Sequence, residues 1–137
     1  MKFETRRLGP EIDAIAPDGS EIRVMGVRPG GTFAHCTLPA GATSLAVRHQ
    51  TVEEIWYFLS GAGEVWRLFE DTEDVTPVSA GTSVTIPLGT HFQFRATGDE
   101  PLRFVLVTMP PWPGEREAVR VADHWPTGNR RPERARD

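Results

Sequence analysis

The pattern of apolar and polar residues along the chain predicts a series of short strands. Runs rich in Val, Ile, Thr, Phe and Trp alternate with turn signals such as "RPGG", "LPAG", "SGAG" and "TGDE". No segment repeats apolar residues with the period of about 3.6 residues that marks a long helix. The predicted strands span residues 21–27, 32–38, 44–49, 54–60, 63–69, 82–87, 91–96 and 102–109. Many short strands at regular spacing indicate an all-β fold, either a closed barrel or a sandwich.

The remaining stretches have a different character. The acidic segment 70–81, "EDTEDVTPVSAG", is expected to form a hairpin loop. Residues 109–125 are proline-rich and should fold back over the barrel, with Trp112 and Trp125 as anchors, because large aromatic side chains seldom stay exposed. Residues 126–137 have almost no apolar side chains and are expected to form a mobile tail. Residues 1–125 then make up a single domain.

Composition narrows the functional classes. The 137 residues, 39% of them hydrophobic and 25% charged, are typical of one soluble globular domain. A net charge of -4 provides no basic surface, so we expect no nucleic-acid partner. No apolar run is long enough for a membrane helix, and "MKFETRRLGP" lacks the core of a signal peptide, so we expect a cytoplasmic protein without membrane contact. Cys36 is the only cysteine and is expected to be a buried, inert thiol.

Two spaced motifs resemble those of the cupin superfamily. In the first, Gly41 is followed by "ATSLA", by "VRH" at 47–49, and then by Glu54 and Gly61. In the second, Gly81 is followed by "TSVTI" and then by Pro87 and Gly89. The resemblance covers roughly residues 30–110. It implies a single cupin barrel of the double-stranded β-helix, or jelly-roll, type, and a homodimer.

The departures from these motifs concern the metal ligands. Cupins that bind a metal usually do so through two histidines and a glutamate of the first motif and one histidine of the second. Here these four positions hold, in order, Val47, His49, Glu54 and Phe92. His91 comes one residue early, and an offset of one on a strand turns the side chain to the opposite face. Apolar side chains therefore replace two of the customary ligands.

His49 and Glu54 are the candidate catalytic residues. A histidine beside a carboxylate inside a barrel can move a proton near neutral pH. The simpler alternative is that Glu54 pairs at the rim and His49 is a satisfied polar group. A second alternative is a metal site of His49, Glu54 and His91, in which a bulge turns His91 inward to hold iron, manganese, nickel or zinc. Otherwise we expect no cofactor.

The side chains around this pair suggest the kind of ligand. If Val47, Trp56, Phe92 and Phe94 share the inner face, the pocket is apolar with a small polar patch, which suits a small organic molecule. The same side chains could instead fill the barrel completely. Three functions stay open: an enzyme that transfers protons without redox chemistry (an isomerase, cyclase, dehydratase or lyase), a metal-dependent enzyme, and a non-catalytic protein that binds or senses a small molecule.

Overall fold

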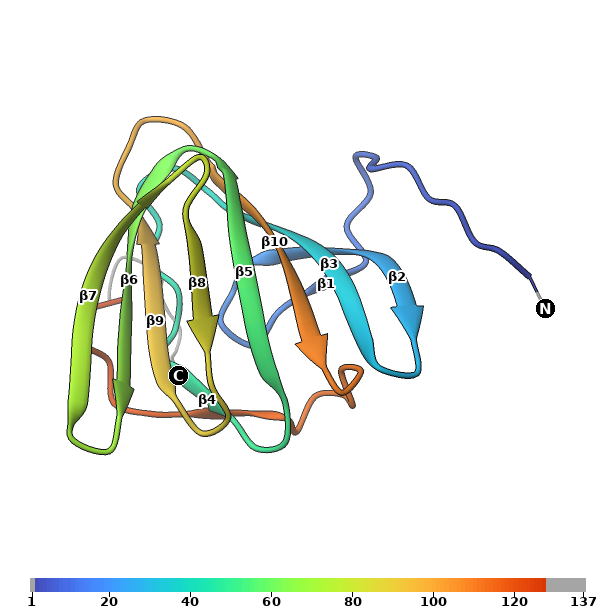
Figure 1. The fold of residues 1–137 in the computed structure, drawn as a ribbon. Coiled ribbons are helices and arrows are strands. Elements are labelled where there is room, and N and C mark those ends of the chain that lie inside the picture. The colour runs from blue at the N-terminus through green and yellow to red at the C-terminus, as the bar shows by residue number, and fades with distance from the viewer. Residues whose placement is uncertain (1, 128–137) are drawn as a thin grey trace, which may run out of the picture.

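The fold consists of two antiparallel sheets that face each other (Figure 1). The computed structural model describes residues 2–127, and within this range it contains eleven strands and no helix. One sheet has the order β1 (Ala14–Ile15), β2 (Glu21–Arg28), β3 (Gly31–Leu38), β10 (Leu102–Met109), β5 (Glu53–Ser60) and β8 (Ser83–Ile86). The other has the order β11 (Ala118–Arg120), β4 (Val47–His49), β9 (His91–Ala96), β6 (Ala62–Phe69) and β7 (Thr72–Ser79). The expected all-β jelly-roll fold is confirmed.

Alternation along the strands builds the core between the sheets. In β5 the buried residues alternate with exposed ones, so that Trp56 and Phe58 point inward. The Trp56 ring stacks on Phe104 of β10 at 4.6 Å between ring centroids and meets the edge of Phe94 of β9 at 5.1 Å. Aromatic pairs of this geometry stabilise a core beyond the area that they bury. They join the two sheets across the interior.

The pairing of β4 with β9 decides which residues of the two motifs face inward. Val47 lies opposite Phe92, and Arg48 lies opposite His91. Val47 and Phe92 are both 1% exposed, whereas Arg48 and His91 are partly exposed. Directly opposed residues share a face of the sheet, so Val47 and Phe92 point into the barrel together.

The expected hairpin loop at 70–81 is wrong, because residues 72–79 form strand β7. This strand is at the edge of its sheet and pairs only with β6 among the described strands. Polar side-chain contacts join β7 to β6: Glu73 accepts a hydrogen bond from Trp66 Nε1 at 2.7 Å, and Asp74 forms an ion pair with Arg67 at 3.2 Å. An edge strand held by such cross-strand pairs needs no apolar alternation, which is the signal that the prediction used.

The C-terminal segment closes one end of the barrel. After β10 the chain runs along the end where the β4–β5 turn lies, and β11 then pairs with β4 (Figure 1). The Trp125 ring lies 4.3 Å from the Arg95 guanidinium, so this part of the segment is anchored as expected. Of the expected mobile tail at 126–137, residues 128–137 lie outside the described residues.

The N-terminal segment is irregular and leaves the barrel (Figure 1). Before Ala14 it contains no strand in the described range, and β1 is its only strand there. Arg23 holds it through hydrogen bonds to the backbone oxygens of Gly9 and Pro10, whereas the Phe3 side chain is 92% exposed. No helix within residues 2–127 has the length and apolar character to cross a membrane.

Gly61 explains why its motif position requires glycine. Its φ of 84° is in the left-handed region that favours glycine. A Cβ at this position would also collide with the backbone carbonyl oxygen of Pro101. The tight turn between β5 and β6 therefore depends on the missing side chain.

Candidate functional site

The two sheets enclose a cavity of about 520 Å³ at the end covered by the C-terminal segment. Inward-facing side chains of β2, β3, β4, β5, β9 and β10 line it, together with residues of the N-terminal and C-terminal segments. The interior is therefore not completely filled, and the cavity is in the size range of small-molecule sites.

His49 ends strand β4 and forms part of the cavity wall. It is 6% exposed, and its ring meets the edges of Phe92 and Trp112, each at 5.1 Å between centroids. Within the described residues its Nδ1 atom has no hydrogen-bond partner. A buried imidazole nitrogen without a partner is rare in proteins and is available to a ligand.

Glu54 lies near the start of β5 on the same inner wall. It is 4% exposed, and its Oε1 accepts a hydrogen bond from Trp56 Nε1 at 2.8 Å. Glu54 and Trp56 point to the same face of the sheet because they are two residues apart on β5. The Glu54 Oε2 atom lies 3.9 Å from His49 Nδ1, which is too long for a direct hydrogen bond. A ligand atom can therefore interact with both groups.

Burial shifts the two ionisation equilibria in opposite directions. Loss of solvation raises the pKa of Glu54 to about 8; the hydrogen bond from Trp56 lowers it, and the charges of Asp18 and Glu117 raise it. Loss of solvation lowers the pKa of His49 to about 4, against the opposing charge of Glu117. At neutral pH the carboxyl group is therefore protonated and the imidazole uncharged. The contact between them is a pair of neutral groups and not a salt bridge.

Three of the four expected substrate-binding residues line the cavity: Val47, Trp56 and Phe92. Phe94 is not part of the cavity lining; it is fully buried and meets the rings of Trp56 and Phe104 edge to face. Its place is in the core behind the site, because the alternation that turns Phe94 inward does not fix its depth along the barrel.

The structure does not bring His91 to His49 and Glu54. His91 lies beside Arg48 on the other face of β9, and no bulge is present between β4 and β9 at this point. Among residues 2–127 no group of three or more His, Cys, Asp or Glu side chains is placed to hold a metal ion. A catalytic metal commonly takes about three protein ligands. In the described range the facing donor atoms are His49 Nδ1 and Glu54 Oε2, and two such donors do not fit a site of this kind.

Cys36 also lines the cavity. It is 1% exposed, and burial raises the pKa of its thiol well above the ordinary value. The thiol therefore stays protonated and is a weak nucleophile, as the sequence led us to expect.

Sequence reasoning missed Glu117, which holds the turn between His49 and Glu54. Its carboxylate accepts hydrogen bonds from the backbone N–H groups of Thr51 and Val52, both at 2.7 Å, and from the Thr51 hydroxyl at 2.6 Å. Burial acts to raise its pKa, but these hydrogen bonds lower it below the usual range. Nothing in the sequence pairs Glu117 with a turn 65 residues earlier in the chain.

Comparison with known proteins identifies the fold family. The sequence profile of the cupin domain matches residues 34–108, which is more than half of the chain. The chain belongs to the cupin family. The resemblance drawn from the spacing of glycines, proline and glutamate is thereby confirmed.

This cupin is also similar to individual proteins. It is 31% identical over 116 residues to the uncharacterized protein MJ1618 of Methanocaldococcus jannaschii, with 77% of this chain and 88% of that protein covered. Oxalate decarboxylase from Bacillus subtilis matches with a TM-score of 0.68 at 20% identity, over 82% of this chain and 30% of that chain. BH2720 from Bacillus halodurans matches with a TM-score of 0.62 at 19% identity, over 75% and 76% of the two chains.

The structural matches concern the fold alone, because their sequence identities are low. The cupin described here spans about a third of the oxalate decarboxylase chain, since 30% of that chain is covered.

Proposed function

We propose that this cupin is an enzyme that transfers a proton on a small organic molecule, with His49 as the base and Glu54 as the acid. The observation that carries the proposal is the pair of facing atoms at the cavity wall. His49 Nδ1 has no partner within the described residues and lies 3.9 Å from Glu54 Oε2. Both groups are nearly inaccessible from outside, so a ligand in the cavity is their natural partner.

The protonation states support these roles. Because Oε1 of Glu54 accepts the Trp56 N–H, Oε2 is the oxygen that carries the proton of the neutral acid. In the proposed step His49 takes a proton from a carbon next to a carbonyl group, while Glu54 donates its proton to the carbonyl oxygen. The product is an enol. In a substrate whose enol is conjugated with a second double bond, the His49 imidazolium returns its proton to a different carbon and Glu54 takes back the proton of the enol oxygen, which completes an isomerisation and regenerates both groups. Cyclisation, dehydration and lyase reactions can begin with the same step.

The apolar wall supports the same reaction. Val47, Trp56 and Phe92 would hold the body of the substrate, and they keep water from the two polar groups. A substrate held against these rings would present its reactive carbon to His49. We therefore expect proton transfer without redox chemistry.

The experiment is hydrogen–deuterium exchange at carbon, followed by NMR in D₂O. The substrates are acetophenone and 4-acetylbenzoate, which share one methyl ketone. We expect exchange above the buffer rate with at least one of them, and a loss of about 10²- to 10⁴-fold in His49→Ala, because the base is removed. Glu54→Gln should also slow exchange, since its amide still accepts the Trp56 N–H but is not an acid.

His91→Ala is the matched control. His91 lies on the opposite face of β9, so its loss should leave exchange unchanged. Loss of exchange in this variant would instead support the metal-dependent alternative. Equal exchange in the wild type and in His49→Ala would contradict the proposal. If the wild type binds a ketone but exchanges the hydrogens of neither ketone, the non-catalytic binding function replaces the proposed reaction.

A further inference from the structure

The cavity has a polar end built from neighbouring strands. Thr108 of β10 lies opposite Glu54 of β5 on one side and opposite Thr32 of β3 on the other. All three side chains line the cavity. The Thr32 hydroxyl accepts the backbone N–H of Trp112 at 3.1 Å, so it already has a partner.

Thr108 has no such partner. Its side chain is 3% exposed, and its Oγ1 makes no hydrogen bond to any residue in the range 2–127. A hydroxyl group can donate one hydrogen bond and accept two, and a buried one without partners is unfavourable. Together with His49 Nδ1, it is a second unpartnered polar atom in the same cavity wall. A ligand oxygen close to β10 would satisfy Thr108 Oγ1, while His49 Nδ1 remains available to accept a proton.

The charges around the cavity restrict the ligand further. In the part of the chain that the structure describes, no lysine or arginine lines the cavity. Its acidic lining residues are Asp18, Glu54 and Glu115. An anionic ligand would lose its hydration and find no cation in exchange, which is strongly unfavourable. The walls therefore select against carboxylates and phosphates.

We propose that the cavity takes an uncharged organic molecule whose carbonyl or hydroxyl oxygen hydrogen-bonds to Thr108, with an apolar body packed against Trp56 and Leu106. This inference deepens the proposed function and rests on its site. Because burial keeps the Glu54 carboxyl protonated at neutral pH, the neighbour of Thr108 is also uncharged. Oxalate decarboxylase, which has a similar fold, is by its name an enzyme for a carboxylate substrate. It therefore gives no guide to the ligand of this cupin.

The test is the affinity of the full chain for matched pairs of compounds, measured by titration calorimetry. The pairs are acetophenone with benzoate, and 2-octanone with octanoate. We expect each ketone to bind at least about tenfold more tightly than its carboxylate partner. Equal or tighter binding of the carboxylates, or no saturable binding of either ketone, would overturn the inference.

Two variants test the role of Thr108. Thr108→Val removes the hydroxyl at similar volume and should weaken acetophenone binding about three- to tenfold. Binding of ethylbenzene, which has no oxygen, should not weaken. Thr85→Val, on the exposed face of β8, is the control and should leave both affinities unchanged. Unchanged acetophenone affinity in Thr108→Val would remove Thr108 from the site.

These measurements separate the inference from the proposed function, because binding does not require turnover. A preference for ketones without carbon exchange would contradict only the proposed reaction. If 4-acetylbenzoate exchanges as fast as acetophenone and binds with equal affinity, only the inference that the ligand is uncharged would be contradicted.

Discussion

Burial decides the charge of His49 and Glu54. Each side chain is at least nine-tenths covered, and for His49 the loss of solvation outweighs the opposing effect of the Glu117 charge. Transfer of an isolated charge into an apolar environment is so costly that such groups become neutral instead. The site thus holds a protonated carboxyl group and an uncharged imidazole, which are the forms that the proposed acid–base step requires.

The pH dependence of the free energy of unfolding tests the raised pKa of Glu54. Between the unfolded pKa of a glutamate and about 8, folded Glu54 holds a proton that the unfolded chain has released. Its contribution is complete below the unfolded pKa and is lost as the pH rises through the folded pKa. The free energy of unfolding should therefore fall by about 2 kcal/mol more in the wild type than in Glu54→Gln between about pH 6 and about pH 8. Urea denaturation measures it, and parallel curves would contradict the raised pKa.

His49 acts in the opposite sense at lower pH. Its folded pKa of about 4 lies below that of an unfolded histidine, so its contribution is complete above the unfolded value and is lost on acidification. Comparison with Glu54→Gln at the same pH cancels this effect. The comparison therefore reports Glu54 alone.

Residue identity carried part of the site but not all of it. Motif spacing placed His49 and Glu54 on the inner wall, and strand alternation separated His91 from Phe92. Alternation could not reveal that the Thr108 hydroxyl lacks a partner within the described residues, because that depends on the side chains of β3 and β5 around it. Satisfaction of a polar group is a property of the packed structure.

At the scale of elements, the C-terminal segment fixes the turn that joins β4 and β5. Glu117 binds the backbone of this turn, and Gln50 donates to the Arg116 carbonyl oxygen at 2.6 Å. Strand β11 then continues the sheet beside β4. The position of His49 relative to Glu54 therefore depends on a segment that follows the barrel in the sequence.

The variant Glu117→Gln tests whether Glu117 stabilises the turn between β4 and β5. The amide can accept fewer of the three hydrogen bonds and has no charge, so we expect a loss of about 1–3 kcal/mol in the free energy of unfolding. Because the folded pKa of Glu117 is lowered, its contribution is present above the unfolded pKa and is lost as the pH falls. Glu115→Gln, at an exposed neighbouring position, should change stability by less than about 0.5 kcal/mol. Equal stability of the two variants at neutral pH would show that Glu117 does not stabilise this turn.

Strands with apolar alternation were predictable, and others were not. The predicted boundaries 91–96 and 102–109 agree with β9 and β10. Strand β7 was missed because polar pairs at a sheet edge hold it. Strands β1 and β11 have only two and three residues, too short for a periodic pattern.

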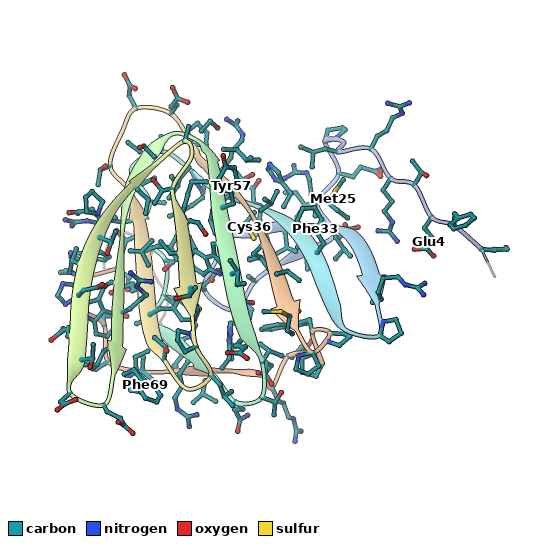
Figure 2. All side chains as sticks on the ribbon, viewed as in Figure 1. Glu4, Met25, Phe33, Cys36, Tyr57 and Phe69 are labelled. Carbon is teal, nitrogen blue, oxygen red and sulfur yellow. The ribbon has the colours of Figure 1, made fainter. Side chains whose placement is uncertain are left out.

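At the scale of the whole molecule, one apolar surface lies outside the barrel. Val107 lies between Phe33 and Ile55 in the register of β3, β10 and β5, and Phe33 and Ile55 are 45% and 44% exposed. Tyr57, 48% exposed, extends this face along β5, as the side chains labelled in Figure 2 show for Phe33 and Tyr57. A second copy of the chain could cover the same face by twofold symmetry.

The homodimer implied by the family resemblance therefore stays a prediction with a defined surface. Light scattering of the purified protein should give twice the mass of one chain. Tyr57→Lys should shift it toward the monomer, because a charge would be buried between the sheets. Val75→Lys, on the exposed face of β7, is the control and should leave the dimer intact. A monomeric wild type would contradict the expectation.

The cavity itself could not be predicted from sequence. The same inward side chains could fill a barrel or leave space, and the outcome depends on Trp112 and on segments distant in the chain. Spacing identified the fold because glycine turns and strand lengths are local properties. Cavity volume depends on packing between both sheets and both ends of the chain.

The most direct test of the account is the pH profile of ketone exchange at carbon in the wild type and in Glu54→Gln. With a protonated Glu54 and an uncharged His49, wild-type exchange should be level between about pH 5 and about pH 7 and should decline as Glu54 ionises near 8. The decline should disappear in Glu54→Gln, and exchange should be lost in His49→Ala. A wild-type rate that rises through pH 8, or that survives without His49, would contradict the acid–base pair.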